Sequence, residues 1–201
     1  MSKAYSIKAN NKPTLFTWDL ETEDQNVDRQ ITSKRNKDTD KLEIKRTQLR
    51  QLKSDFHDIV FRNEINFDQV ERFFNLIRHG KSGVWETATL AIERLAYHFE
   101  LAKVRLSKDL ADNDSKYVAN LVTSIGEFYS KEELNTLFRN LLKHKSAKVK
   151  ERTLNKIFEL RFAEIKGDLE RLKQSETNKR TIEQIEFTLK FVDTPKGNLT
   201  I

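Results

Sequence analysis

Apolar residues recur every three or four positions along most of the chain, which is the period of an amphipathic helix. This pattern begins at Leu42 and continues to Val192. Pro13 and Pro195 flank the stretch, so its interior lacks the residue that breaks helices most strongly. The pattern therefore predicts an all-α body over residues 42–194, followed by a short C-terminal tail over residues 195–201.

Capping signals divide this body into helices. Asn66 with Gln69, and Ser130 with Glu133, have the spacing of capping boxes, in which two side chains satisfy orphan backbone donors at a helix start. Gly80 is expected to end the helix that follows the first box. We expect a first helix that starts at residue 42. Further helices are expected over about 67–79, 84–99, 101–110, 116–129 and 131–142, with two or three more up to residue 192.

The first forty residues follow a different pattern. Phe16 and Trp18 alternate with polar residues, which is the period of a strand, and Asn10-Asn11 offers a turn before them. Residues 22–41 contain few large apolar side chains. We therefore expect an extended arm or β-hairpin and a polar linker over residues 1–41, with Phe16 and Trp18 docking on the helical body or on a partner.

Apolar positions also repeat at a longer period. One series has successive offsets of 33, 32 and 32 residues: Ile92, Ile125, Ile157 and Leu189. A second series shifts in step with it: Phe73, Leu106 and Phe138. Paired helices that repeat at this length are typical of an α-solenoid, because one helix pair cannot bury its apolar face without its neighbours.

The turns between paired helices carry a resemblance to a known class. Lys81-Ser82-Gly83-Val84 and Lys145-Ser146-Ala147-Lys148-Val149 resemble the turn-plus-helix segments of HEAT-like repeats, over about four units and residues 66–192. The resemblance implies an all-α, short HEAT-like helical-repeat solenoid. Several units lack the usual Asp-Pro of the turn, so no subfamily is identified.

Composition narrows the chemistry of this body. The 201 residues include no Cys, which excludes disulfides, a catalytic thiol and Cys-ligated zinc. None of the four His residues has a second His three or four positions away, as a metal-binding helix would require. Gly80-Lys81-Ser82 lacks the earlier glycine of a phosphate loop, because Asn75 stands there. We therefore expect no catalytic residue, no cofactor and no metal.

Two further signals are absent from the sequence. No run of 18 or more apolar residues occurs, and Met1-Ser2-Lys3 opens no signal-peptide pattern. We therefore expect a cytoplasmic protein without a membrane partner.

Basic residues gather at the expected inter-helix turns of this chain, whose formal net charge is +6. In a solenoid such turns line up along one edge, and the resulting ridge could contact an acidic partner. Asp109, Asp112 and Asp114 interrupt the ridge at one turn. The candidate partner-binding residues are Phe16, Trp18, Lys81, Trp85, Lys145, Lys148, Lys150, Arg152, Lys179 and Arg180.

Three functions are compatible with these features. The favoured one is a non-enzymatic module that grips a protein with acidic patches, since small chains of this kind resemble immunity or inhibitor partners of toxins, and scaffold subunits. The alternative is nucleic-acid binding through the ridge, similar to HEAT-like alkylpurine DNA glycosylases, with Trp85 and Glu86, or Tyr117 and Asp114, as the nearest aromatic-carboxylate pairs. The third is an architectural subunit of a larger assembly, which would expose large apolar patches.

Overall fold

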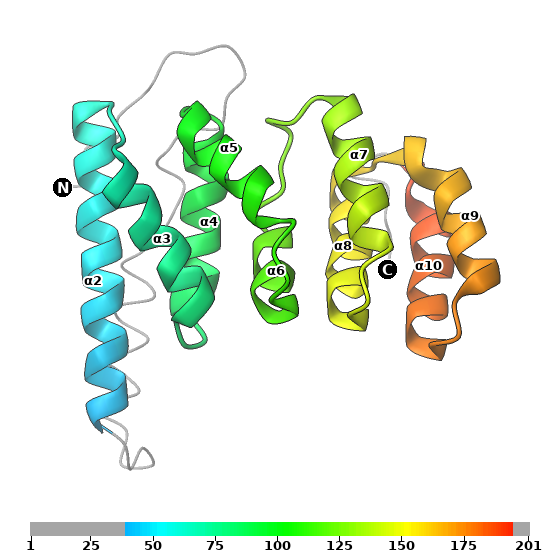
Figure 1. The fold of residues 1–201 in the computed structure, drawn as a ribbon, viewed down its shortest axis with the longest axis horizontal. Helices are drawn as coiled ribbons and strands as arrows, with labels where there is room; N and C mark the ends of the chain where they lie inside the picture. The colour runs from blue at the N-terminus through cyan, green and yellow to red at the C-terminus, as the bar shows by residue number, and fades with distance from the viewer. Residues whose placement is uncertain (1–38, 195–201) are drawn as a thin grey trace. The chain divides into compact units, whose positions relative to one another are not determined.

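The computed structural model describes residues 39–194, and within this range it holds nine α-helices, one short 3-10 helix and no strand (Figure 1). The predicted all-α class is thus confirmed for the described part of the chain. The arm predicted at the N-terminus, with Phe16 and Trp18, and the tail predicted over 195–201 lie outside the described residues. The described residues divide into two compact units, 39–107 and 108–194, and each is described by itself.

The first unit is built from helices that pack around one apolar core. They are α2 (Thr39–Arg62), α3 (Phe67–His79), α4 (Val84–Ala96) and most of α5 (Glu100–Asp109). α2, α3 and α4 pack on one another, with Ile59, Phe73 and Ile92 completely or almost completely buried. Residues 39–41, which the sequence assigns to a polar linker, form the first residues of α2 instead.

Local signals at the two ends of α3 act as predicted. The Asn66 side chain accepts a hydrogen bond from the Gln69 N–H at 2.9 Å, and the Gln69 side chain accepts one from the Asn66 N–H at 3.0 Å. α3 ends before Gly80, where any Cβ would clash with the carbonyl oxygen of Leu76 and the side chain of Val84. Glycine is therefore required at residue 80 by close packing of the turn.

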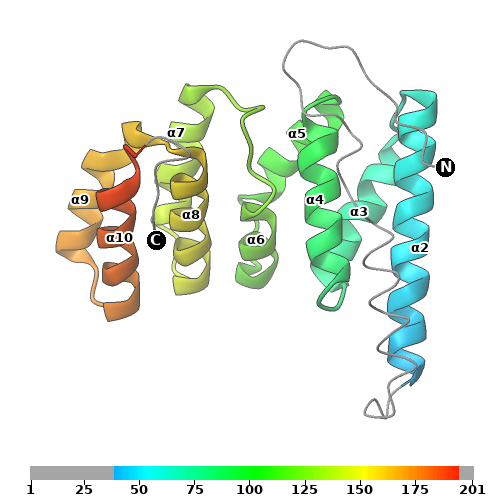
Figure 2. The ribbon, with the colours of Figure 1, turned by 180° about the vertical axis from the view of Figure 1, so that it is seen from behind.

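The second unit arranges its helices in two layers. Its helices are α6 (Ser115–Val122), α7 (Lys131–Leu142), α8 (Ala147–Leu160), the 3-10 helix η1 (Ala163–Ile165), α9 (Lys166–Ser175) and α10 (Lys179–Phe191). α8 packs against α6, α7 and α10, and α9 packs against α10. α7 and α9 form one layer, and α8 and α10 lie side by side in the other, as the two opposite views show (Figures 1 and 2).

α6 is shorter than the sequence predicts, ending at Val122 rather than near residue 129. The Thr123 hydroxyl donates to the Asn120 carbonyl at 2.7 Å, and the N–H of Ser124 bonds only three residues back, to the carbonyl of Leu121. A side chain that competes for backbone groups weakens a helix, so the chain turns here before the next one begins.

The apolar series are mostly buried. Phe73, Leu106 and Phe138 are each exposed by 1% or less, and Ile92, Ile125 and Ile157 are completely buried. Leu189, the last member of the longer series, is half-buried. Except for Leu189, the core positions predicted from the spacing are therefore core positions in both units.

Candidate functional site

Exposed lysines lie at one edge of the second unit. Lys143 and Lys145 belong to the turn between α7 and α8, and Lys148 lies in the first turn of α8. Lys179 opens α10, which starts at the same edge of the unit as α8 (Figure 1). We call Lys143, Lys145, Lys148 and Lys179 the basic edge. The partial positive charge of two helix N-termini adds to these four side chains.

The first three of these lysines make no ion pair with any residue in the range 39–194, whereas Lys179 lies 3.9 Å from Glu183. Their ammonium groups are therefore available to an acidic partner.

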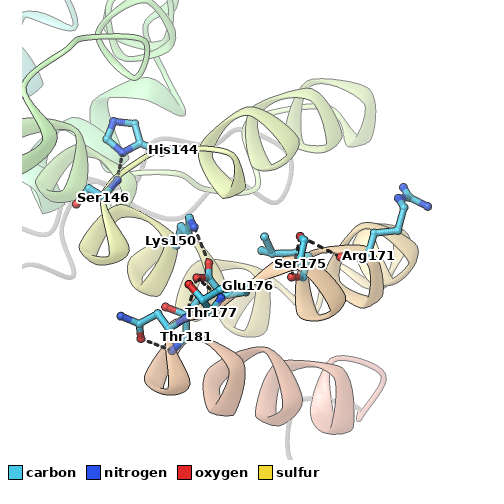
Figure 3. Close-up of polar contacts among 10 residues, drawn as sticks. His144, Ser146, Lys150, Arg171, Ser175, Glu176, Thr177 and Thr181 are labelled. Atoms are coloured by element: carbon cyan, nitrogen blue, oxygen red, sulfur yellow. Dashed lines mark hydrogen bonds and ion pairs between the residues drawn. The ribbon is translucent and has the colours of Figure 1, made fainter.

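Lys150 holds the start of α8 to the turn between α9 and α10 (Figure 3). Its Nζ donates to Glu176 Oε2 at 2.5 Å, and the two side chains are 18% and 8% exposed. Glu176 Oε1 accepts the N–H groups of Thr177 and Asn178 at 3.0 Å each. The hydrogen bond from Lys150, with help from these backbone donors, lowers the pKa of Glu176 below its ordinary value.

His144 adds a titratable group to the same edge. Its Nδ1 accepts the Ser146 N–H at 3.0 Å, just before α8 begins (Figure 3). Partial burial, followed by the charges of Lys145 and Lys150, lowers the pKa of His144. The neutral imidazole that this hydrogen bond requires is thus favoured by its surroundings.

Two more of the predicted residues are held by contacts within the second unit. One guanidinium nitrogen of Arg152 donates to the Ala119 carbonyl at 2.8 Å and to Asn120 Oδ1 at 2.9 Å, which joins α8 to α6. Arg180 pairs with Glu151 at 2.9 Å, although its side chain stays 77% exposed. Lys150 and Arg152 are thus held by buried or half-buried contacts, and Arg180 makes an exposed ion pair. The basic edge is therefore a narrower candidate site than the ridge predicted from the sequence.

The predicted residues of the first unit lie at the start of α4. Lys81 is exposed, and its carbonyl accepts the N–H groups of Val84 at 2.9 Å and Trp85 at 3.2 Å. Trp85 is half-buried in the first turn of the helix. Because these residues belong to the other compact unit, we treat the second unit's basic edge as a site in its own right.

The carboxylates of the two aromatic-carboxylate pairs have capping roles. Asp114 accepts the N–H groups of Lys116 and Tyr117 at the start of α6, and Glu86 accepts the Gly83 N–H at the start of α4. The Tyr117 ring is buried, and its hydroxyl donates to Asp109 at 2.5 Å. The carboxylate of each pair therefore accepts backbone N–H groups at a helix start.

A mixed polar and aromatic face, which the sequence reasoning missed, runs along α8 and α10. Its contacts join residues that are 29 positions apart: Glu151 with Arg180, Asn155 with Gln184, and Phe158 with Phe187. The signal in the sequence is this second offset, which differs from the 32-residue offset of the core series. We call this surface the α8–α10 face.

No cluster of three His or acidic side chains within residues 39–194 could hold a metal ion. Among the same residues, no helix combines the length and the apolar character needed to cross a membrane. No protein-family model matches this chain, and no curated protein or solved structure is detectably similar to it. Its function is therefore inferred from its own residues.

Proposed function

We propose that this chain is a non-enzymatic, HEAT-like helical-repeat module that binds a protein partner through the basic edge of its second unit. An immunity or inhibitor protein and a scaffold subunit are the two kinds of binding module that this proposal covers. The observation that carries it is the contrast among the basic residues. Lys150, Arg152 and Arg180 are paired with other residues of the unit, while Lys143, Lys145 and Lys148 have no ion pair within residues 39–194.

Support for the helical-repeat class comes from how far apart in the sequence the contacting residues lie. Arg139 of α7 pairs with Asp168 of α9 at 3.0 Å, 29 residues later, and Lys131 pairs with Glu164 at 2.6 Å, 33 residues later. Arg152 reaches back 33 residues to the Ala119 carbonyl. Contacts at separations close to the length of one repeat are expected when each helix pair stacks on the next.

The proposal of a protein partner rather than a nucleic acid rests on charge. Carboxylates stand on the same helices as the basic edge, including Glu159 and Glu183, whose side chains are 58% and 62% exposed. A nucleic acid carries a phosphate at every nucleotide and would meet these carboxylates, whereas a protein can place its acidic residues only where lysines face them.

Co-purification from cells treated with nuclease tests this function. The full chain should retain a protein in stoichiometric amount, and the variant K143Q/K145Q/K148Q should lose it. The control K41Q/K45Q/K53Q removes three lysines from α2 of the first unit, two of them half-buried, and should retain the partner. Thermal unfolding of both variants checks that they remain folded.

Two results would contradict the proposal. One is recovery of nucleic acid alone, with binding to duplex DNA that falls steeply as salt rises, which would favour the nucleic-acid alternative. The other is a protein partner that both triple variants retain equally, which would place the binding surface elsewhere.

A further inference from the structure

We infer that the α8–α10 face recognises an extended polypeptide segment that has acidic side chains at one end and a large apolar side chain at the other. The inference rests on the proposed function, because it names the chemistry of the partner segment and the surface that receives it. Figure 2 presents the two helices of this face toward the viewer.

The constant 29-residue offset shows that α8 and α10 run side by side in register. Glu151 contacts Arg180 at 2.9 Å near the helix starts, Asn155 contacts Gln184 in the middle, and the rings of Phe158 and Phe187 lie 5.1 Å apart near the ends. The face therefore changes along its length from ionic to amide to aromatic. Such a gradient gives a bound segment a direction.

The aromatic end of the α8–α10 face is a preorganised apolar surface. Phe187 is 43% exposed, and it is the one large apolar side chain of the second unit, within the described residues, that is markedly exposed. Phe158 and Phe191 hold its ring at centroid distances of 5.1 and 4.9 Å, and the Arg161 guanidinium lies 4.0 Å above the Phe158 ring. Rings fixed in this way lose little further freedom on binding, which favours them as anchors.

The amide pair in the middle fits a peptide backbone. Gln184 Nε2 donates to Asn155 Oδ1, which leaves the NH₂ group of Asn155 as a donor and Oε1 of Gln184 as an acceptor, side by side. An extended chain presents an N–H group that needs an acceptor and a C=O group that needs a donor. These two side chains can therefore hold the backbone of a segment irrespective of its sequence.

The lysines at the cationic end of the α8–α10 face determine where the acidic side chains of the bound segment lie. Lys148 is exposed in the first turn of α8, and the side chain of Lys179, at the start of α10, is 91% exposed. Lys148 precedes Phe158 by ten residues, or about 15 Å along the helix axis. An extended chain covers that distance in four or five residues, so the acidic and apolar side chains should be that far apart.

Selection of a displayed library of random 12-residue peptides on the full chain tests this inference. Enriched peptides should carry Asp or Glu four or five residues from a Phe, Trp, Tyr, Leu, Ile or Met. A synthetic copy of the most enriched peptide should bind about tenfold or more weakly to F187S. F61S is the matched control, because Phe61 is 74% exposed on α2 of the first unit, and it should bind the peptide as the wild type does.

A second variant covers the case in which F187S loses stability. Q184E places a carboxylate on the amide pair without removing an apolar side chain, and it should weaken the same peptide severalfold because the peptide is acidic. Peptides without the acidic-to-apolar pattern, or no enriched peptide, would overturn the inference. An enriched peptide that both F187S and Q184E bind normally would also overturn it.

The outcome can be separated from that of the proposed function. If a co-purified protein is lost by K143Q/K145Q/K148Q but retained by F187S and Q184E, the module still binds protein through its basic edge and only the inference about the α8–α10 face fails. Single-stranded DNA that binds the wild type and is lost by F187S would overturn the inference in favour of base stacking.

Discussion

Replacing Glu176 by Gln tests how strongly Lys150 holds α8 to the α9–α10 turn. The substitution keeps an oxygen for the backbone donors of Thr177 and Asn178, but it turns an acceptor of the Lys150 proton into an NH₂ donor. A hydrogen bond to a charged group contributes about 1.5–3 kcal/mol, and the largely buried ammonium loses its counter-charge as well. Because Lys150 is still 18% exposed, water offsets part of this loss. We expect E176Q to lower the free energy of unfolding by about 2 kcal/mol at pH 7.

The pH dependence of this loss gives a sharper test. The pKa of Glu176 is lowered in the folded chain, so its stabilising contribution is present above the ordinary value of 4.5 and is lost as pH falls through the lowered pKa. The difference between wild type and E176Q should therefore shrink as pH falls from 7 toward 2. Urea unfolding followed by circular dichroism at constant ionic strength measures it.

E164Q is the matched control for this experiment. Glu164 also pairs with a lysine, Lys131 at 2.6 Å, but their side chains are 43% and 78% exposed, so little change in stability is expected. A double-mutant cycle between E176Q and K150M should yield a coupling energy above about 1 kcal/mol. The reasoning is refuted if that coupling is near zero, or if E176Q is equally destabilising at pH 7 and at the acid end.

Three other substitutions address the core, a cap and the histidine. Phe138→Ala should cost about 3–5 kcal/mol of unfolding free energy in urea, because the ring is completely buried and packs edge-on at 5.5 Å from Phe162; a cost below 1 kcal/mol would contradict its place in the core. Ser130→Ala should cost about 1 kcal/mol by removing the 3.2 Å cap to the Glu133 N–H, and an unchanged urea midpoint would contradict that role. The pKa of His144 lies below 6.5 in the fold, so the wild type should lose stability as pH falls below 6.5, where the unfolded chain takes up the proton first. His144→Gln should not show this loss when melting temperatures at pH 7.5 and 5.5 are compared, and equal losses in both proteins would count against it.

The helices were largely predictable because their signals are local. The boxes at Asn66 and Ser130 involve side chains three residues from their partners, so spacing alone identifies them. α6 was predicted to be too long because Thr123 interrupts it through its hydroxyl, and an apolar pattern carries no information about that hydrogen bond.

The candidate site was less predictable because its contacts join distant residues. Lys148 and Lys150 look alike in the sequence, yet the second is held by Glu176, 26 residues away, and the first has no ion pair within residues 39–194. The α8–α10 face was missed for a similar reason. Core residues repeat every 32 positions along the sequence. Phe158, in contrast, contacts Phe187 across an offset of 29 residues, which is about one helical turn less.

Hydrogen exchange of the chain with its co-purified protein partner tests the central claim most directly. If the second unit binds protein through its basic edge, amides of residues 143–150 and of the first turn of α10 should exchange more slowly in the complex. The remaining surface helices, including α3 and α9, should be unaffected. Protection confined to the first unit, or a complex that leaves residues 143–150 unprotected, would contradict the account.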